Sequence, residues 1–232
     1  MHKSLLSASL IALALAAPAA HAHEAGEILV RAGAITVNPK ADSGNVRVDR
    51  GSLAGTNLNG KATMSSDTQL GLNFAYMITN NIGIELLAAT PFEHDVKLKN
   101  TDLGPANGKL GTLKHLPPTL SVVYYPLDSK SVFQPYVGAG INYTWIYDEH
   151  VGSRASEAGF DNFRAKNSWG LAWQVGADYM LTDKLMVNAQ VRYIDINTTA
   201  YVDNVAVGSG TRAKVNVDVD PMVYMVGLGY KF

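Results

Sequence analysis

The chain has 232 residues, with 19 lysines and arginines against 20 aspartates and glutamates, and it contains no cysteine. So balanced a charge excludes the strongly basic surface that a nucleic-acid partner requires. The lack of cysteine excludes disulfides and thiolate metal sites.

The N-terminus has the three parts of a secretory signal peptide. A positive start ending at Lys3 is followed by an apolar run over residues 5–17 and an A-x-A cleavage pattern ending at Ala22. The run is too short for a transmembrane anchor, which needs about 20 residues. We predict cleavage after Ala22, so that residues 1–22 are the signal peptide and residues 23–232 form a single domain.

Eight segments of the remaining chain alternate with a period of two, as half-buried β-strands do. In each segment, one of the two alternating sets of positions is apolar or aromatic and holds no charged residue. The apolar sets span residues 28–34, 70–78, 84–92, 118–124, 137–145, 169–179, 185–193 and 222–232. The chain is therefore predicted to be all-β.

The opposite positions indicate which face of the sheet meets lipid. They carry charges of both signs among glycine, serine and asparagine, a mixture suited to a narrow polar interior. Aromatic residues fall at the strand ends, where the interfacial girdles of membrane barrels lie. A soluble barrel or sandwich with an apolar core also alternates, but these features favour an apolar outside and a polar inside.

The connections between segments alternate in length. The short links are residues 80–81, 126–133 and 182–183, and the long polar ones are residues 38–66, 99–112, 148–167 and 201–212. Outer-membrane barrels have this asymmetry of short periplasmic turns and long extracellular loops. Because backbone groups within lipid must be paired, the strands must close on themselves. We predict an eight-stranded antiparallel transmembrane β-barrel, too narrow for a wide aqueous pore.

Six segments together resemble the OmpW family of small outer-membrane β-barrels. They read SDTQLGLNFAYM (66–77), AATPF (88–92), LPPTL (116–120), FQPYVGAGINYT (133–144), SWGLAWQVGADYML (168–181) and DVDPMVYMVGLGYKF (218–232). The resemblance implies a narrow, largely hydrophobic channel that takes up small hydrophobic molecules and releases them through the barrel wall into the membrane. It is not an enzyme family, and we expect no cofactor.

Pro91, Pro117 and Pro118 are the most informative candidate site residues. Proline cannot donate to a β-ladder and is normally confined to edges or bulges, yet a closed barrel has no edge. An antiparallel register that places Ile82 opposite Pro126 also places Pro91 opposite Pro117. This predicts a lateral seam through which an apolar solute passes sideways. The alternative is that the prolines only bend their strands at a β-bulge.

Five charged residues are predicted to point into the lumen: Arg31, Glu85, Asp178, Arg192 and Lys231. Buried charges in so narrow an interior must be paired or hydrated. We expect a plug of ion pairs in the middle and periplasmic half. The plug either is purely structural or also blocks ions and diverts an apolar solute to the wall.

Apolar residues also occupy inward positions, among them Leu29, Leu87 and Met225. They either line an apolar channel or fill space. Three histidines in polar stretches lack cysteine partners and ligand spacing, so no metal site is predicted. His94 and Ser121 suggest a hydrolase pair, but no acid completes a triad, and an enzyme is not expected.

The last strand ends on Tyr230 and Phe232, resembling the C-terminal signature by which outer-membrane barrels are recognised for assembly. The expected partners are therefore outer-membrane lipid, small hydrophobic solutes and the barrel-assembly machinery. Two functions remain open. One is a passive uptake channel with lateral exit near Pro91 and Pro117, and the other is a structural, adhesive or receptor barrel with a packed, non-conducting interior.

Overall fold

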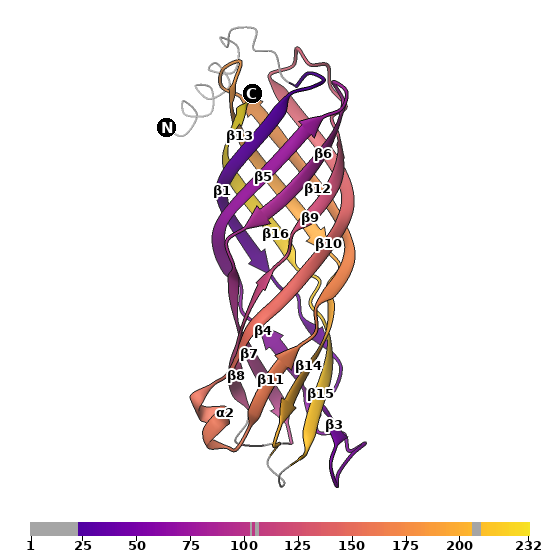
Figure 1. The fold of residues 1–232 in the computed structure, drawn as a ribbon, viewed down its shortest axis with the longest axis vertical. Helices are drawn as coiled ribbons and strands as arrows, with labels where there is room; N and C mark the ends of the chain where they lie inside the picture. Colours follow the sequence, from indigo (N-terminus) through magenta and orange to yellow (C-terminus); the bar gives the residue numbers. More distant parts are fainter. Residues whose placement is uncertain (1–22, 103, 105–106, 206–209) are drawn as a thin grey trace, which may run out of the picture.

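The computed structural model describes residues 23–102, 104, 107–205 and 210–232, and the predicted signal peptide lies outside these residues. The described chain forms an elongated β-barrel (Figure 1). Its elements are β1 (Ile28–Asn38), β2 (Asp42–Ser43), β3 (Arg47–Arg50), β4 (Asn59–Met64), β5 (Asp67–Met77), β6 (Ile82–Ala89), β7 (Phe92–Thr101), β8 (Gly108–Leu116), β9 (Thr119–Tyr124), β10 (Phe133–Val151), α2 (Ser153–Glu157), β11 (Asp161–Ala165), β12 (Ser168–Met180), β13 (Leu185–Ile194), β14 (Asn197–Asp203), β15 (Arg212–Asp218) and β16 (Met222–Lys231).

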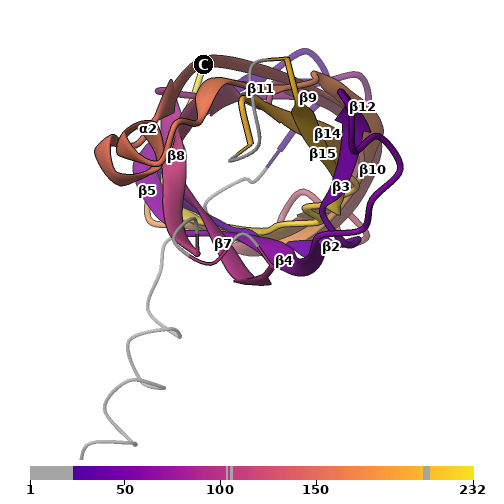
Figure 2. The ribbon, with the colours of Figure 1, turned by 90° about the horizontal axis from the view of Figure 1, so that it is seen from below.

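Eight antiparallel strands close the barrel. Round the ring they follow the order β12, β13, β16, β1, β5, β6, β9 and β10, and β10 pairs back onto β12. The first and last of these strands in the chain are neighbours, with Leu29 opposite Lys231. Figure 2 looks along the barrel from its lower end in Figure 1 and shows the ring. The predicted eight-stranded antiparallel barrel is confirmed.

The outside of this ring is apolar and its inside is polar. On β12, Trp173 is 56% exposed, whereas the next residue, Gln174, is 4% exposed. Trp169 and Phe232, near opposite ends of the apolar belt, are each 69% exposed. The arrangement is that of a transmembrane barrel, with an apolar belt facing lipid between two aromatic girdles. None of the described helices is long and apolar enough to cross a membrane.

Past the outer girdle the strands continue as an extension of the barrel (Figure 1, lower half). Residues 38–66, predicted as a long connection, contain β2, β3 and β4, and residues 148–167 contain α2 and β11. One wall of the extension is formed by β4, β7, β8 and the far half of β10, and the other by β2, β11, β14 and β15. These polar connections thus contain short strands, which satisfy their backbone groups by pairing with neighbouring strands.

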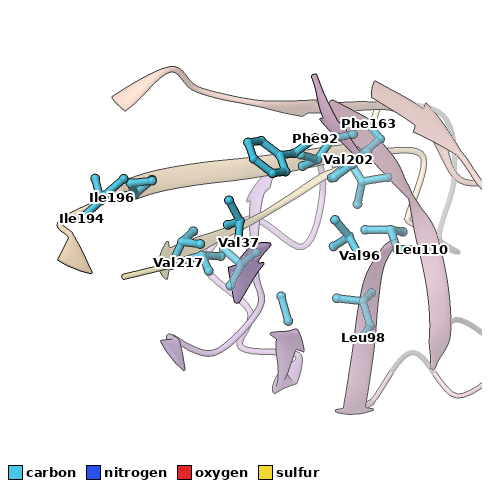
Figure 3. Packing of buried hydrophobic residues seen from close by; sticks show 14 of the residues in the cluster. Val37, Phe92, Val96, Leu98, Leu110, Phe163, Ile194, Ile196, Val202 and Val217 are labelled. Atoms are coloured by element: carbon cyan, nitrogen blue, oxygen red, sulfur yellow. The ribbon is translucent and has the colours of Figure 1, made fainter. Parts of the chain in front are cut away.

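The polarity of the two faces is inverted in the extension. On β7, Glu93 and Lys97 are exposed, whereas Phe92, Val96 and Leu98 are buried. Figure 3 shows apolar side chains from several strands meeting inside. The sequence pattern predicts Phe92 on the outward face, and this prediction is wrong. Water rather than lipid surrounds the extension, so the apolar side chains turn inward.

Candidate functional site

The hydrogen-bonded wall of the barrel is interrupted where the three candidate prolines lie. The β6–β9 ladder runs as far as Leu87 opposite Thr119, and the β7–β8 ladder starts again past the prolines. Between the two ladders, residues 88–91 and 116–118 form no ladder pair with each other in the described chain. We call this interruption the seam.

The register next to the seam differs from the predicted one. Ile82 lies opposite Tyr124, not opposite Pro126. The predicted pairing of Pro91 with Pro117 is therefore wrong. Pro126 follows the end of β9 and takes no part in the ladder, so it was a poor marker of where the pairing begins.

The two sides of the seam differ in length by one residue. From Leu87 to Phe92 the first side advances five positions (92 − 87 = 5), whereas from Thr119 to His115 the second side advances four (119 − 115 = 4). An extra residue on one strand is a β-bulge. Beyond the bulge, the alternate positions that faced outward on β6 face inward on β7. This is why Phe92 is buried. The β-bulge predicted as the alternative to a seam is present, and so is the break in ladder pairing.

Each edge of the seam is held by its other neighbour. On the first edge, the backbone N–H of Thr90 donates to the carbonyl of Leu70 on β5 at 2.9 Å. On the second edge, the N–H of Tyr143 on β10 donates to the carbonyl of Pro118 at 3.1 Å. The wall is thus anchored on both flanks of the seam.

Asn142 on β10 ties the proline corner to the interior. Its Nδ2 lies 3.0 Å from the carbonyl oxygen of Pro117, 3.1 Å from that of Pro118 and 3.0 Å from Oγ1 of Thr119. Its Oδ1 accepts from the hydroxyl of Thr144 at 2.7 Å. This role is not predictable from the sequence, because an asparagine at an inward strand position carries no signal of its own.

Four of the five predicted interior charges meet in one buried network. Arg31 donates to both carboxylate oxygens of Asp178, at 2.9 and 2.6 Å, and to Glu85 at 3.3 Å. Arg192 donates to the other oxygen of Glu85 at 2.7 Å, and Gln174 donates to it at 2.9 Å. Arg192 also donates to the side-chain oxygen of Gln174. We call these five residues the polar network.

His23 is hydrogen-bonded to the polar network, whereas Lys231 has an ion-pair partner outside it. The ring of His23 hydrogen-bonds Asp178 through Nε2 at 2.8 Å and packs edge-on against Tyr125 at 4.8 Å between ring centroids. Lys231 forms an ion pair with Glu27 at 3.0 Å. His23 lies before the first strand, so the alternating pattern gave no reason to place it inside the barrel.

The polar network separates two apolar regions. Leu87 and Met225 belong to the cluster that continues into the extension, and Leu29 belongs to a second cluster with Met180 and Met186. Glu85 lies two positions from Leu87 along β6, and Arg31 lies two positions from Leu29 along β1. The polar network therefore separates the three predicted channel residues: Leu29 lies on its periplasmic side, and Leu87 and Met225 lie on the other.

Two small cavities lie in the described interior. A cavity of about 30 Å³ lies beside His94 and His115, and another of about 20 Å³ lies beside Phe163 and Leu98. Each has room for about one water molecule. Within the described ranges, no group of three or more histidines, aspartates or glutamates is placed to hold a metal ion.

Comparison with known proteins gives the family. The OmpW family model matches residues 24–232. The chain belongs to the OmpW family. Outer membrane protein W of Escherichia coli (strain K12) is 44% identical to it over 230 residues, which make up 99% of this chain and 100% of that protein. The crystal structure of the outer membrane protein OprG from Pseudomonas aeruginosa has 46% sequence identity and a TM-score of 0.82, with 91% of this chain and 98% of that one covered.

A more distant relative is the dibenzothiophene metabolism operon protein PahQ of Pseudomonas aeruginosa. It is 26% identical over 176 residues, which cover 75% of each protein. Family membership and the apolar belt together place this OmpW-family barrel in the outer membrane, in contact with its lipid.

Proposed function

We propose that this OmpW-family barrel is a passive channel for small hydrophobic molecules. They descend through the apolar interior of the extension and leave sideways into the membrane through the seam at residues 88–91 and 116–118. The position of the seam carries the proposal. It lies where the apolar interior ends at Leu87, and the polar network begins two positions further along β6, at Glu85.

The seam is the place where the wall opens at least cost. Elsewhere a lateral opening must break ladder hydrogen bonds, each contributing about 1 kcal/mol net. Pro91, Pro117 and Pro118 have no N–H to contribute, and no ladder pair joins the two edges in the described chain. An apolar solute can separate these two edges while each edge stays hydrogen-bonded to its other neighbour, β5 or β10.

The polar network closes the straight path to the periplasm. An apolar solute entering it would separate buried charges from their partners, such as Arg31 from Asp178, at a cost of several kcal/mol. The lipid beside the seam offers the solute a better environment. Passive transfer of this kind needs no cofactor, energy source or catalytic step.

The name of PahQ connects one relative with dibenzothiophene, a compound without charge or strong hydrogen-bonding groups. It is therefore a suitable test solute. We expect cells with this protein in their outer membrane to take up dibenzothiophene faster than cells without it. Uptake of a small sugar should not change.

The test of the seam is a double substitution, Pro91→Ala with Pro117→Ala. Alanine supplies an N–H at each position and allows the two edges to pair, so we expect uptake of dibenzothiophene to fall. Pro126→Ala is the matched control, since Pro126 lies outside the ladder, and it should leave uptake unchanged. Normal uptake by the correctly folded double variant contradicts the lateral route.

A second candidate function is a structural, adhesive or receptor barrel. The small size of the two interior cavities favours it, because cavities of about 30 and 20 Å³ hold no hydrophobic solute in this conformation. This function requires uptake of dibenzothiophene to be the same with and without the protein. The external surface formed by β3, α2 and β11 would then carry the activity.

Delivery to the membrane is part of the same proposal. We propose that residues 1–22 are removed after Ala22 and that residues 23–232 fold as one domain. We propose also that Tyr230 and Phe232 are read by the barrel-assembly machinery. Phe232 supports this role, because its ring is 69% exposed at the end of β16 and packs against Tyr230 at 4.7 Å.

A further inference from the structure

Two histidines stand side by side inside the barrel, next to the seam. Nε2 of His94 lies 2.7 Å from Nε2 of His115, and the rings stack with centroids 4.8 Å apart. The ring of Phe92 lies nearly parallel to both, with its centroid 5.3 Å from that of His115 and 6.4 Å from that of His94. The pair lies past the outer girdle, at the level where the outward neighbours Glu93 and Lys114 are charged. Both rings are buried.

The hydrogen bonds fix which nitrogen carries each proton. Nδ1 of His94 lies 2.6 Å from the carbonyl oxygen of Ser65, which only accepts, so this Nδ1 donates. Burial lowers the pKa of His94 and lowers the pKa of His115 to about 3, so both rings are neutral at pH 7. Nε2 of His94 is then an acceptor, and Nε2 of His115 must donate to it.

The remaining nitrogen, Nδ1 of His115, is therefore a hydrogen-bond acceptor. It is buried and has no hydrogen-bond partner among the described residues. A buried acceptor left unpaired is destabilising. Among the described residues, Nδ1 of His115 therefore lacks a hydrogen-bond donor at this point of the lumen.

The surroundings supply no such donor. The cavity next to the pair is lined mostly by apolar side chains, including Met64, Leu113 and Ile196. Two hydroxyls also line it, but both donate elsewhere: that of Thr144 to Asn142 at 2.7 Å and that of Thr198 to the carbonyl of Lys166 at 2.6 Å. A donor that reaches His115 has to arrive with a molecule in the lumen.

We propose that Nδ1 of His115 accepts a hydrogen bond from the hydroxyl group of an alcohol with an apolar tail, as this solute passes through the lumen to the seam. The inference rests on the proposed uptake function and adds to it a preference, at His115, for solutes that carry one O–H donor on an apolar body. The cavity beside the pair has to widen to admit the tail, which then packs against Phe92 and the apolar lining while His115 selects for the hydroxyl. An ether of the same size has no proton to offer and gains nothing there.

The test compares 1-hexanol with its isomer 1-methoxypentane, using the full barrel in lipid nanodiscs with ¹⁵N-labelled histidine. We expect 1-hexanol to move the Nδ1 resonance of His115 toward the hydrogen-bonded value and to bind about fivefold more tightly than the ether, the equivalent of one net hydrogen bond. Equal shifts with the two isomers, or no shift with either because water already fills the position, overturn the proposal.

Two substitutions separate the nitrogens of His115. His115→Gln keeps an amide N–H near the position of Nε2, for His94, and removes the acceptor at Nδ1. His115→Asn keeps an acceptor near Nδ1 and removes the donor to His94. With the resonances of His94 as the readout, we expect the Gln variant to lose the preference for 1-hexanol and the Asn variant to retain it. The reverse result overturns the assignment.

These experiments distinguish failure of the His115 binding site from failure of the channel function. Selective binding of 1-hexanol without any uptake of dibenzothiophene contradicts the channel function and leaves the His115 site standing. Uptake of dibenzothiophene without selective binding of 1-hexanol contradicts the His115 site and leaves the channel standing.

Discussion

The side-chain amide of Asn142 donates to the carbonyl of Pro117 at 3.0 Å and so ties the middle of β10 to the corner where β8 ends. This bond and the one to Pro118, at 3.1 Å, come from inside the barrel to a stretch of wall that lacks ladder bonds. We expect these bonds to restrain that edge of the seam.

Replacing Asn142 with leucine should loosen the seam. Leucine has a similar shape but no donor, so the carbonyls of Pro117 and Pro118 lose their side-chain partner. We expect a loss of about 1 kcal/mol in unfolding free energy for each hydrogen bond removed, because both carbonyls keep another donor, together with faster uptake of dibenzothiophene. Urea unfolding in lipid vesicles measures the first quantity and whole-cell uptake the second.

The control for this variant is Thr144→Val, which removes the hydrogen bond to Oδ1 of Asn142 but leaves its amide group in place. Uptake by this variant should stay close to that of the wild type. If Asn142→Leu is less stable but takes up solute at the wild-type rate, Asn142 supports the fold without controlling the seam.

The polar network should be far more sensitive than surface ion pairs. Asp178→Asn removes the carboxylate charge that pairs with Arg31 through two hydrogen bonds. Breaking such a buried pair costs about 3–5 kcal/mol. Asp95→Asn breaks an exposed pair with Lys109 and should cost less than about 1 kcal/mol. Urea unfolding of both variants in vesicles compares them. Equal effects would show that the network is well solvated.

The double variant Arg31→Met with Asp178→Leu removes both charges together. It should recover part of the stability lost by Asp178→Asn alone, because no buried charge is then left without its closest partner. Urea unfolding in vesicles compares the two variants. A double variant no more stable than Asp178→Asn would contradict this account of the pair.

His115 should stay neutral well below pH 6. Burial in the lumen beside His94 holds the pKa of His115 at about 3, while Asp67 acts weakly in the opposite direction. An unfolded histidine titrates near about 6.5, so the unfolded chain binds more protons between these two values. The contribution of His115 to stability is therefore complete above about pH 6.5 and is lost as the pH falls toward 3. A ¹⁵N titration that places this transition near 6.5 contradicts the burial of the ring.

Removal of Phe232 should reduce assembly. The ring lies on the lipid-facing side at the end of the last strand and is exposed for recognition. We expect a marked drop in folded protein in the outer-membrane fraction, measured by heat-modifiable migration on gels. Ile28→Ala, which changes an outward residue on the neighbouring strand β1, is the control. Normal amounts of the truncated barrel would show that Phe232 is not needed.

The sequence predicted the parts of the fold that depend on local alternation in lipid. Each membrane strand has to turn apolar side chains outward, so a residue such as Trp173 reveals its own orientation. The parity of Glu85, Arg31, Asp178 and Arg192 gave their inward direction for the same reason. That they form one network was expected from the narrowness of the lumen, which brings inward charges within reach of each other.

What the sequence could not provide depends on neighbours that are distant along the chain. The bulge next to Pro91 exists only relative to the opposite strand, so the burial of Phe92 could not be read from β7 alone. The roles of Asn142 and His23 come from the partners that the fold brings to them. In the extension, the short strands β2 and β3 are polar and have no alternating pattern that marks them as strands.

The most direct test of the lateral route is to label the path with an apolar solute that carries a photoreactive diazirine. After uptake and illumination in whole cells, mass spectrometry identifies the labelled residues. The account predicts labelling of Leu87, Phe92 and the seam residues 88–91 and 116–118, with none at Met180 and Met186 on the periplasmic side of the polar network. Labelling of these two methionines would show that the solute passes straight through the barrel and would contradict lateral exit.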